Sequence, residues 1–422
     1  MQSPPYLVAA LAALATAAPN HSLAHLSFSW DTLPRYTFCV NSSGPFDQET
    51  LEYVAKQHIF LNNPSLDREP PGSMDNSTIR MPLQAKALRE LNPSQAQWFY
   101  YAIDLIRPHN FWDDHYVAYH DECRLKDVNG DPVPRMVWDF GTDCGVEAWL
   151  NTSRAMITEG GLDGIFIDGF QGCNPFEGVD KGLAGCTRVC TSKAGCDPDV
   201  MVAWNRGLVK AMWRLKREIL GENGTLICNY TPGPFTCDPA KPIADCPCDG
   251  TNDERGGGSW DHVKSIADLE AAQGDYAMLT HVPHGNIDSK LEESVAQFLM
   301  AASDYQYHGS GFGYECGQDG WLSRSDDVER MYSAPLGAPL GPAAETGGAC
   351  GKEQGCCAKN ATCDPSCHAP GDYCVRTRAF ATGTTAYVNY TGGGGCIRWS
   401  DGTNTSYPNH LGVQGCDEAA AF

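Results

Sequence analysis

The stretch Leu162-Asp163-Gly164-Ile165-Phe166-Ile167-Asp168-Gly169-Phe170 carries the clearest structural signal in the chain. Its centre is a continuous apolar run, the pattern of a parallel strand that is buried on both faces. One aspartate precedes the run and another follows it. In a barrel of parallel strands, the carboxyl ends of the strands form the open mouth where catalytic groups lie. We therefore place Asp168 at that mouth and Asp163 at the opposite, structural end.

Similar runs recur along the chain, with helical periodicity between them. Other strands are predicted at Arg35–Val40, His58–Asn62, Gln97–Ile106, Arg135–Phe140, Thr225–Tyr230, Tyr276–Val282 and Tyr305–Gly311. Helices are predicted at Gln84–Leu91, Cys144–Thr158, Asp197–Leu220, Asp261–Gln273 and Asp288–Ala302. Strands that alternate with helices in about eight units favour an α/β fold with a closed (β/α)8, TIM-like barrel. No GxGxxG follows the first strand, which counts against a dinucleotide-binding fold.

Three cysteine-rich stretches interrupt this framework, at Cys173–Cys196, Cys228–Cys248 and Cys350–Cys374. The third holds six cysteines and almost no large aliphatic residues, so bridges rather than an apolar core must hold it together. A disulfide-held loop without a binding role of its own is favoured there over a small chitin-binding-like module.

The segments Arg378–Tyr390 and Cys396–Ser400 predict antiparallel strands. They would form a small C-terminal β appendage, with Cys396 and Cys416 as candidates for a covalent tie to the barrel. The predicted domains are a barrel over residues 30–345, a cysteine-rich insertion over 346–376 and the appendage over 377–422.

The N-terminus predicts a secretory signal peptide over residues 1–17. Tyr6–Ala15 is apolar but too short to span a bilayer, and Ala15-Thr16-Ala17 has a small-x-small cleavage pattern. No Lys or Arg precedes the apolar run, which leaves a core helix or a disordered leader as the alternative. All 20 cysteines and nine N-x-Ser/Thr sequons follow it. Such cysteine usage predicts disulfides and a secreted glycoprotein, with metal binding at the short Cys246-Pro247-Cys248 spacing as the weaker alternative.

The formal net charge is −22. This charge disfavours nucleic acid and anionic membrane surfaces as partners, because both bind to basic surfaces. It suits a protein that acts on neutral or cationic material. No segment after the leader is apolar enough to predict a membrane span, and no motif predicts a cofactor.

The run GLDGIFIDGF (Gly161–Phe170) resembles the fourth strand of glycoside-hydrolase-like barrels. Further resemblance lies in KDVNGDPVP (Lys126–Pro134), VWDFGTDCGVEAWL (Val137–Leu150), APLGAPLGPA (Ala334–Ala343) and RAFATGTTAYVNY (Arg378–Tyr390). Together they resemble the hypothetical glycosyl-hydrolase-like TIM-barrel family related to the endo-α-1,4-polygalactosaminidase group. The likeness covers most of residues 35–400 outside the cysteine-rich stretches. It implies a sugar-hydrolysing barrel, an activity assigned to such families largely by fold.

Hydrolysis of a glycosidic bond usually needs two carboxyl groups, one as proton donor and one as nucleophile or base. Asp168 is the first candidate. Glu254 stands where a sixth strand should end and is the preferred proton donor, with Glu315, after the last predicted strand, in reserve. Asp139 follows Arg135–Trp138, at the end of a predicted third strand. It is the third candidate for the proton donor, and it would otherwise bind a sugar hydroxyl or tune Asp168 by repulsion. For each of these acids, an ordinary solvated carboxylate is the alternative.

Sugar rings bind to flat aromatic faces with hydrogen-bonding groups around them. The substrate-binding candidates are Trp112, Trp138, Asn229, Tyr230 and His284, and core packing is the alternative for each aromatic residue. Asn229 lies in a sequon and should escape glycosylation if it lines the pocket. His120-Asp121-Glu122 has the residue types of a metal site, but neighbours in an extended segment point in different directions, so no metal is predicted.

These features predict a secreted glycoside hydrolase that acts on a polysaccharide or glycan. The alternative is a non-catalytic carbohydrate-binding or cell-surface structural protein that kept the barrel and lost the chemistry. An Asp168 locked onto an arginine, with no second acid nearby, would favour that alternative. The sugar, its linkage and the oligomeric state are left open.

Overall fold

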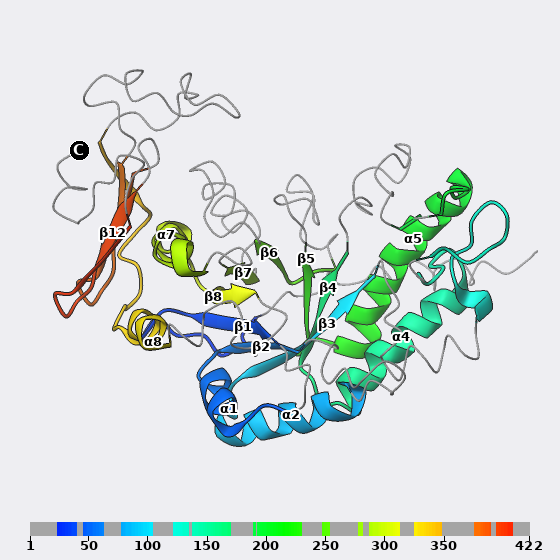
Figure 1. Cartoon of the computed structure of the whole chain (residues 1–422), viewed down its shortest axis with the longest axis horizontal. Coiled ribbons are helices and arrows are strands. Elements are labelled where there is room, and N and C mark those ends of the chain that lie inside the picture. Colours follow the sequence, from blue (N-terminus) through cyan, green and yellow to red (C-terminus); the bar gives the residue numbers. More distant parts are fainter. Residues whose placement is uncertain are drawn as a thin grey trace, which may run out of the picture.

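The computed structural model describes residues 23–39, 45–62, 77–103, 121–134, 137–169, 189–190, 192–229, 247–253, 277–281, 287–312, 325–347, 375–389 and 394–407. Eight parallel strands close into a barrel in chain order, and β1 pairs with β8 to complete it (Figure 1). The strands are β1 Arg35–Cys39, β2 Ile59–Asn62, β3 Ala96–Ala102, β4 Gly164–Asp168, β5 Thr225–Asn229, β6 Gly250–Asp253, β7 Ala277–His281 and β8 Gln306–Phe312. The predicted (β/α)8 barrel is confirmed.

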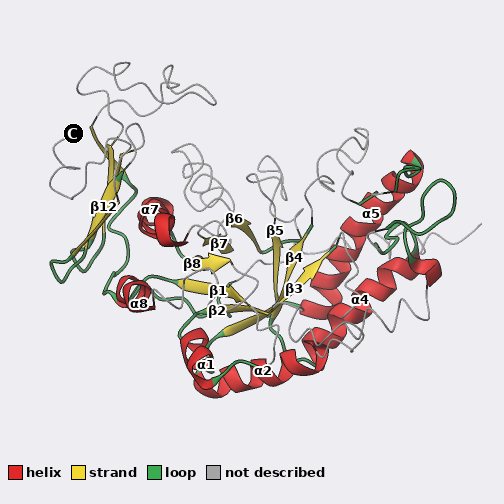
Figure 2. Cartoon of the chain, viewed as in Figure 1, coloured by secondary structure: helices red, strands yellow, loops and turns green. Residues whose placement is uncertain are grey.

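Helices surround the strands (Figure 2). They are α1 Gln48–Ala55, α2 Ser77–Leu91, α4 Asp143–Thr158, α5 Pro198–Arg214 with a π-helical continuation at Leu215–Leu220, α7 Ile287–Ala301 and α8 Ser325–Ser333. Four of the five predicted helices are confirmed, and the fifth, Asp261–Gln273, lies outside the described residues. Asp197 caps α5, because its side chain accepts a hydrogen bond from Asp199 N. Among the described residues, no helix is long and apolar enough to cross a membrane.

The prediction of a strand at Arg135–Phe140 is wrong. Within the described part of this segment, Trp138 makes only an isolated antiparallel bridge with Arg124, between β3 and α4. The strand that completes the barrel is β6, with the sequence GTND. No apolar run marks this strand in the sequence. Its first residue is Gly250, where a Cβ would lie 2.3 Å from the Ala277 oxygen, and its next inward residue is the buried, polar Asn252.

The barrel interior is filled by aromatic side chains. Tyr36, Phe38, Trp98 and Phe166 are almost fully buried and belong to one apolar cluster. Gly164 makes room for this packing, because a Cβ there would lie 2.8 Å from Cδ1 of Trp98. The same cluster includes Leu23 and Leu26 of the segment before β1, so an N-terminal segment packs against the barrel interior.

A five-stranded antiparallel sheet follows the barrel in the chain. Its order is β13-β12-β11-β10-β9, with β9 Ala344–Gly347, β10 Val375–Ala379, β11 Thr385–Asn389, β12 Gly395–Arg398 and β13 Asn404–Tyr407. Apolar residues of the sheet, such as Val388 and Ile397, share a buried cluster with Val295 and Leu299 of α7. The sheet therefore packs on the outer helical layer of the barrel, as Figure 1 shows. The predicted β appendage is confirmed, and its first strand precedes the third cysteine-rich stretch.

Every described cysteine is disulfide-bonded. The bridges Cys123–Cys144, Cys190–Cys196 and Cys228–Cys248 each close a segment that follows β3, β4 or β5. Cys39 and Cys396 are also disulfide-bonded. The prediction of structural disulfides is confirmed for these residues, whereas Cys416 and the predicted signal peptide lie outside the described part of the chain.

Candidate active site

Asp168 is the last residue of β4, at the carboxyl end of the barrel strands, and it is partly buried. Gly169 follows with a φ of 93°, a left-handed conformation that favours glycine. This turn brings the Gly169 N–H back to the carboxylate, where it donates a hydrogen bond of 2.7 Å to Asp168 Oδ1. The local sequence Asp-Gly thus orients the side chain at the strand end.

Two neighbouring strands complete the contacts of this carboxylate. Tyr100 of β3 donates its hydroxyl hydrogen bond to Asp168 Oδ2, and Asn229 of β5 donates from Nδ2 to Asp168 Oδ1 at 2.9 Å. β4 pairs with both strands, so their carboxyl ends meet. Within the described part of the chain, three donors and no acceptor contact Asp168, which suits an ionised carboxylate because that form only accepts hydrogen bonds. The arrangement holds a negative charge in a fixed orientation at the barrel mouth.

The hydrogen bonds continue across the barrel behind Asn229. Asn252 of β6 donates from Nδ2 to Asn229 Oδ1 at 3.2 Å. Tyr36 of β1 donates its hydroxyl to Asn252 Oδ1 at 3.4 Å. The sequence did not point to Tyr100, which contacts Asp168, or to Asn252 and Tyr36 behind Asn229, because nothing in their neighbours along the chain marks them as members of this site.

Asp163, at the opposite end of β4, has the structural role that was predicted. Its two carboxylate oxygens accept hydrogen bonds of 2.8 Å from Nη2 of Arg89, and Oδ2 also accepts from Gln97 N at 2.8 Å. The side chain thereby joins α2 to the start of β3 and β4. Its charge is paired, whereas Asp168 faces uncharged donors.

Asp139 does not end a barrel strand, since β3 ends at Ala102. Its carboxylate accepts a hydrogen bond of 3.0 Å from Gly141 N. Burial raises the pKa of Asp139, and the Gly141 hydrogen bond and the Lys126 charge oppose that rise. Trp138 is 3% exposed and lies in the apolar core with Trp204, whose Nε1 donates to the Trp138 oxygen. Core packing therefore occupies the Trp138 ring.

The remaining candidates lie outside the described residues, namely Glu254, Glu315, Trp112, Tyr230 and His284. Glu254 directly follows β6, which ends at Asp253, so a sixth strand does end where it was expected. The distance from Asp168 to a second carboxyl group stays a prediction.

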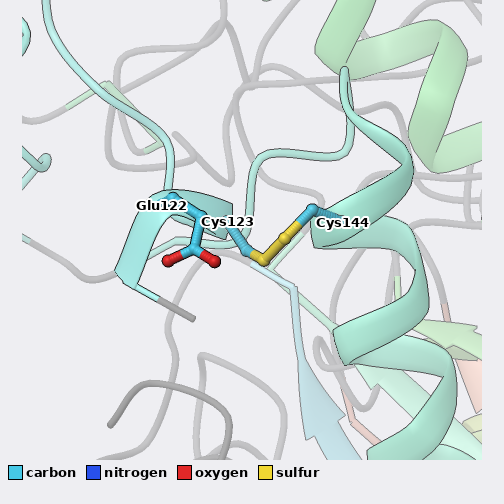
Figure 3. Close-up of side chains that lie close together, drawn as sticks. All are labelled: Glu122, Cys123 and Cys144. Atoms are coloured by element: carbon cyan, nitrogen blue, oxygen red, sulfur yellow. A yellow bond between two sulfur atoms is a disulfide. The ribbon is translucent and has the colours of Figure 1, made fainter. Parts of the chain in front are cut away.

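One cluster in the described part of the chain has the spacing of metal ligands, namely Glu122, Cys123 and Cys144. Figure 3 shows that the two sulfur atoms are bonded to each other as a disulfide. Cysteine binds metal as a thiolate, and a bridged sulfur is not one. The cluster therefore offers one exposed carboxylate, which does not make a metal site.

Comparison with known proteins identifies no family. No protein-family model and no curated protein matches the chain. Similar solved structures include the maltogenic alpha-amylase AmyB from Thermotoga neapolitana, at TM-score 0.45 and 11% identity, covering 90% of this chain and 95% of that one. An alpha-galactosidase from Lactobacillus brevis has TM-score 0.43 and 10% identity, covering 86% of this chain and 46% of that one.

A third similar structure is alpha-L-fucosidase isoenzyme 2 from Paenibacillus thiaminolyticus, at TM-score 0.40 and 12% identity, covering 72% of this chain and 51% of that one. The chain thus spans about half the length of the fucosidase and galactosidase chains. The three names denote glycoside hydrolases, but likeness at this level says nothing about activity. None of them names the endo-α-1,4-polygalactosaminidase group, so that part of the resemblance stays a prediction.

Proposed function

We propose that this protein is a glycoside hydrolase and that Asp168 is its catalytic carboxylate. The observation that carries the proposal is the setting of Asp168 at the barrel mouth, where its partners in the described part of the chain are all uncharged. A partly buried charge without a cationic partner costs folding free energy, and proteins retain such groups at functional sites. The carboxyl ends of barrel strands are also where catalytic groups of this fold lie.

The geometry suits Asp168 to act as nucleophile or base rather than as proton donor. Both oxygens already accept hydrogen bonds, so the proton-free form fits the site. An anion there would attack the anomeric carbon, or activate a water, and would stabilise the positive charge of an oxocarbenium-like transition state. Tyr100 and Asn229 keep its oxygens in place while this charge develops.

The proton donor that we propose is Glu254, with Glu315 as the second choice. Glu254 immediately follows β6, and β6 pairs with β5, which carries the Asn229 contact to Asp168. Carboxyl groups about 5–5.5 Å apart would give retention of anomeric configuration, and about 6.5–9.5 Å would give inversion. Asp139 is a weaker donor candidate, because it lies in the segment before α4 rather than at a strand end.

The substrate that we propose is a polysaccharide or glycan outside the cell. The disulfide bonds fit an oxidising compartment. Export, the signal peptide and glycosylation belong to this proposal.

The test is turnover of a glycan panel by the protein and its Asp168→Asn variant, which removes the charge and keeps the shape. We expect a loss of roughly 10³-fold or more in kcat, as for other catalytic carboxylates. Asp163→Asn is the matched control at the other end of β4, and its turnover per folded molecule should be unchanged. Equal turnover by Asp168→Asn and the unaltered protein would remove Asp168 from the mechanism.

Two further results would separate catalysis from binding and identify the proton donor. Glycan binding without turnover by any form would identify the non-catalytic alternative. If the enzyme is active, Glu254→Gln should lose most activity on sugars with poor leaving groups and retain more on activated aryl glycosides, because only the former need a proton donor. The same pattern in Glu315→Gln instead would move the donor role to that residue.

A further inference from the structure

The hydrogen bonds that run from Tyr36 through Asn252 and Asn229 to Asp168 all donate toward the carboxylate, and the carboxylate end determines this direction. A carboxylate only accepts, so Asn229 must turn its NH2 group toward Asp168. The carbonyl oxygen of Asn229 then faces Asn252, which must present its own NH2 group. The carbonyl oxygen of Asn252 in turn faces Tyr36, whose hydroxyl must donate. Each amide has one donor and one acceptor end, so no link can reverse alone.

Burial makes this direction costly to change. Tyr36 is fully buried, and Asn229 and Asn252 are each 1% exposed. Apolar neighbours such as Phe166 and Ile227 fill the same interior. A flipped amide would place donor against donor or acceptor against acceptor at these contacts, which is costly in a buried interior.

We propose that Asn252 is a positioning residue for Asp168. It does not contact the carboxylate. It holds the Asn229 carbonyl, and this fixes the Asn229 NH2 group as a permanent donor to Asp168. Tyr36 fixes Asn252 in the same way from across the barrel. The catalytic consequence rests on the proposed function, whereas the effect on the Asp168 carboxylate does not.

The decisive variant is Asn252→Leu, which has nearly the same shape and no hydrogen-bonding group. The Asn229 carbonyl then loses its hydrogen bond from Asn252, so the Asn229 NH2 group is held less firmly as a donor to the ionised form of Asp168. The midpoint of the Asp168 titration, followed by carboxyl 13C NMR and assigned with Asp168→Asn, should rise by roughly one pH unit. On an active enzyme, the acid limb of the kcat/KM profile should move to higher pH by the same amount.

The matched control is Asn62→Leu. Asn62 is also fully buried on a barrel strand, but its Nδ2 donates to Gln97 Oε1 and the Trp98 oxygen, and its side chain lies on the outer face with Gln84. This variant should lose stability while the Asp168 titration stays unchanged. A purely structural role for Asn252 would make the two variants behave alike.

Tyr36→Phe gives a second, milder variant that removes one hydroxyl. It should shift the Asp168 titration in the same direction by a smaller amount, and it decides the matter if Asn252→Leu does not fold. An unchanged titration in the folded variant would overturn the positioning role. A shifted titration together with full turnover by Asp168→Asn would leave the positioning role standing and end the proposed function.

Discussion

Asp163 and Asp168 flank one short strand, yet their surroundings differ completely. The N-terminal end of β4 gives Asp163 an arginine, whose Nη2 donates to both carboxylate oxygens, and a backbone N–H. The C-terminal end gives Asp168 a tyrosine, an asparagine and the following backbone N–H. The same residue type is a structural ion pair at one end and, among the described residues, a charge oriented by uncharged donors at the other. The end of the strand, rather than the amino acid, separates the two roles.

His58 should make stability depend on pH. Its Nδ1 accepts a hydrogen bond of 3.2 Å from Arg35 N, and burial, helped by the Arg35 charge, lowers its pKa from 6.5 to about 4. Between these values the unfolded chain binds a proton that the folded protein does not. The contribution of His58 is therefore complete above about pH 6.5 and is lost as the pH falls toward 4, by about 3 kcal/mol in total.

His58→Asn keeps an acceptor near the position of Nδ1 and does not titrate in this range. Urea unfolding at pH 7 and pH 4 should show that the unaltered protein loses about 3 kcal/mol more than this variant does. Equal losses would mean that His58 does not stay neutral in the folded state.

The helix α5 approaches the segment that leads into α4 through a glycine. A Cβ at Gly207 of α5 would lie 1.5 Å from the Phe140 oxygen, in the segment that leads into α4. Beside it, Trp204 Nε1 donates to the Trp138 oxygen at 2.9 Å. At this contact the backbone of Gly207 lies directly against the backbone of Phe140. The apolar residues around Trp138 therefore pack against α5 and do not form a barrel strand.

Gly207→Ala tests this contact with a change whose sign is diagnostic. Helix propensity alone would make alanine more stable by about 1 kcal/mol. Because the Cβ meets backbone, we expect instead a loss of at least about 3 kcal/mol in urea unfolding. Gly341→Ala is the control, since a Cβ there has open space within 4 Å, and it should change stability by about 0.5 kcal/mol or less. A stabilised Gly207→Ala would refute the close approach.

The C-terminal sheet is joined to the barrel by one buried cation as well as by apolar packing. Arg378 of β10 donates from Nη1 to the oxygens of Leu299 and Ala302, at 3.1 and 2.6 Å, and from Nε to Gly341 O at 2.9 Å. The first two lie at the end of α7, where helix carbonyls lack partners and a cation is favourable. Arg378 thus supplies hydrogen-bond donors to carbonyl groups at the C-terminal end of α7, the helix on which the sheet packs.

Arg378→Met keeps the apolar stem and removes the donors, leaving buried carbonyls unpaired. We expect a loss of about 3 kcal/mol. Amide hydrogen exchange should quicken in β10 to β12 and at the end of α7 together. Arg330→Met is the control, because its ion pair with Asp327 on α8 is exposed, and it should change stability by about 1 kcal/mol or less. Faster exchange in the sheet alone would show that the helix end does not depend on it.

The elements that could be predicted from the chain are those whose signals are local. The apolar run of β4, the Asp197 cap of α5 and the cysteine content all act within a few residues or through composition. The number of repeating units then sufficed for the barrel. Only the end of β6, just before Glu254, is predictable from the sequence, because the inward positions of this strand carry glycine and asparagine, which no apolar pattern marks.

Which side chains meet at the candidate site depends on how the barrel closes. Tyr36 and Asn252 are 216 residues apart and become hydrogen-bond partners because β1 and β6 face the same enclosed interior. Periodicity along a chain reports whether a segment is buried, not which distant segment it will face. Closure of the sheet into a barrel determines which distant segments face each other, and so it determines the hydrogen bonds that lead to Asp168.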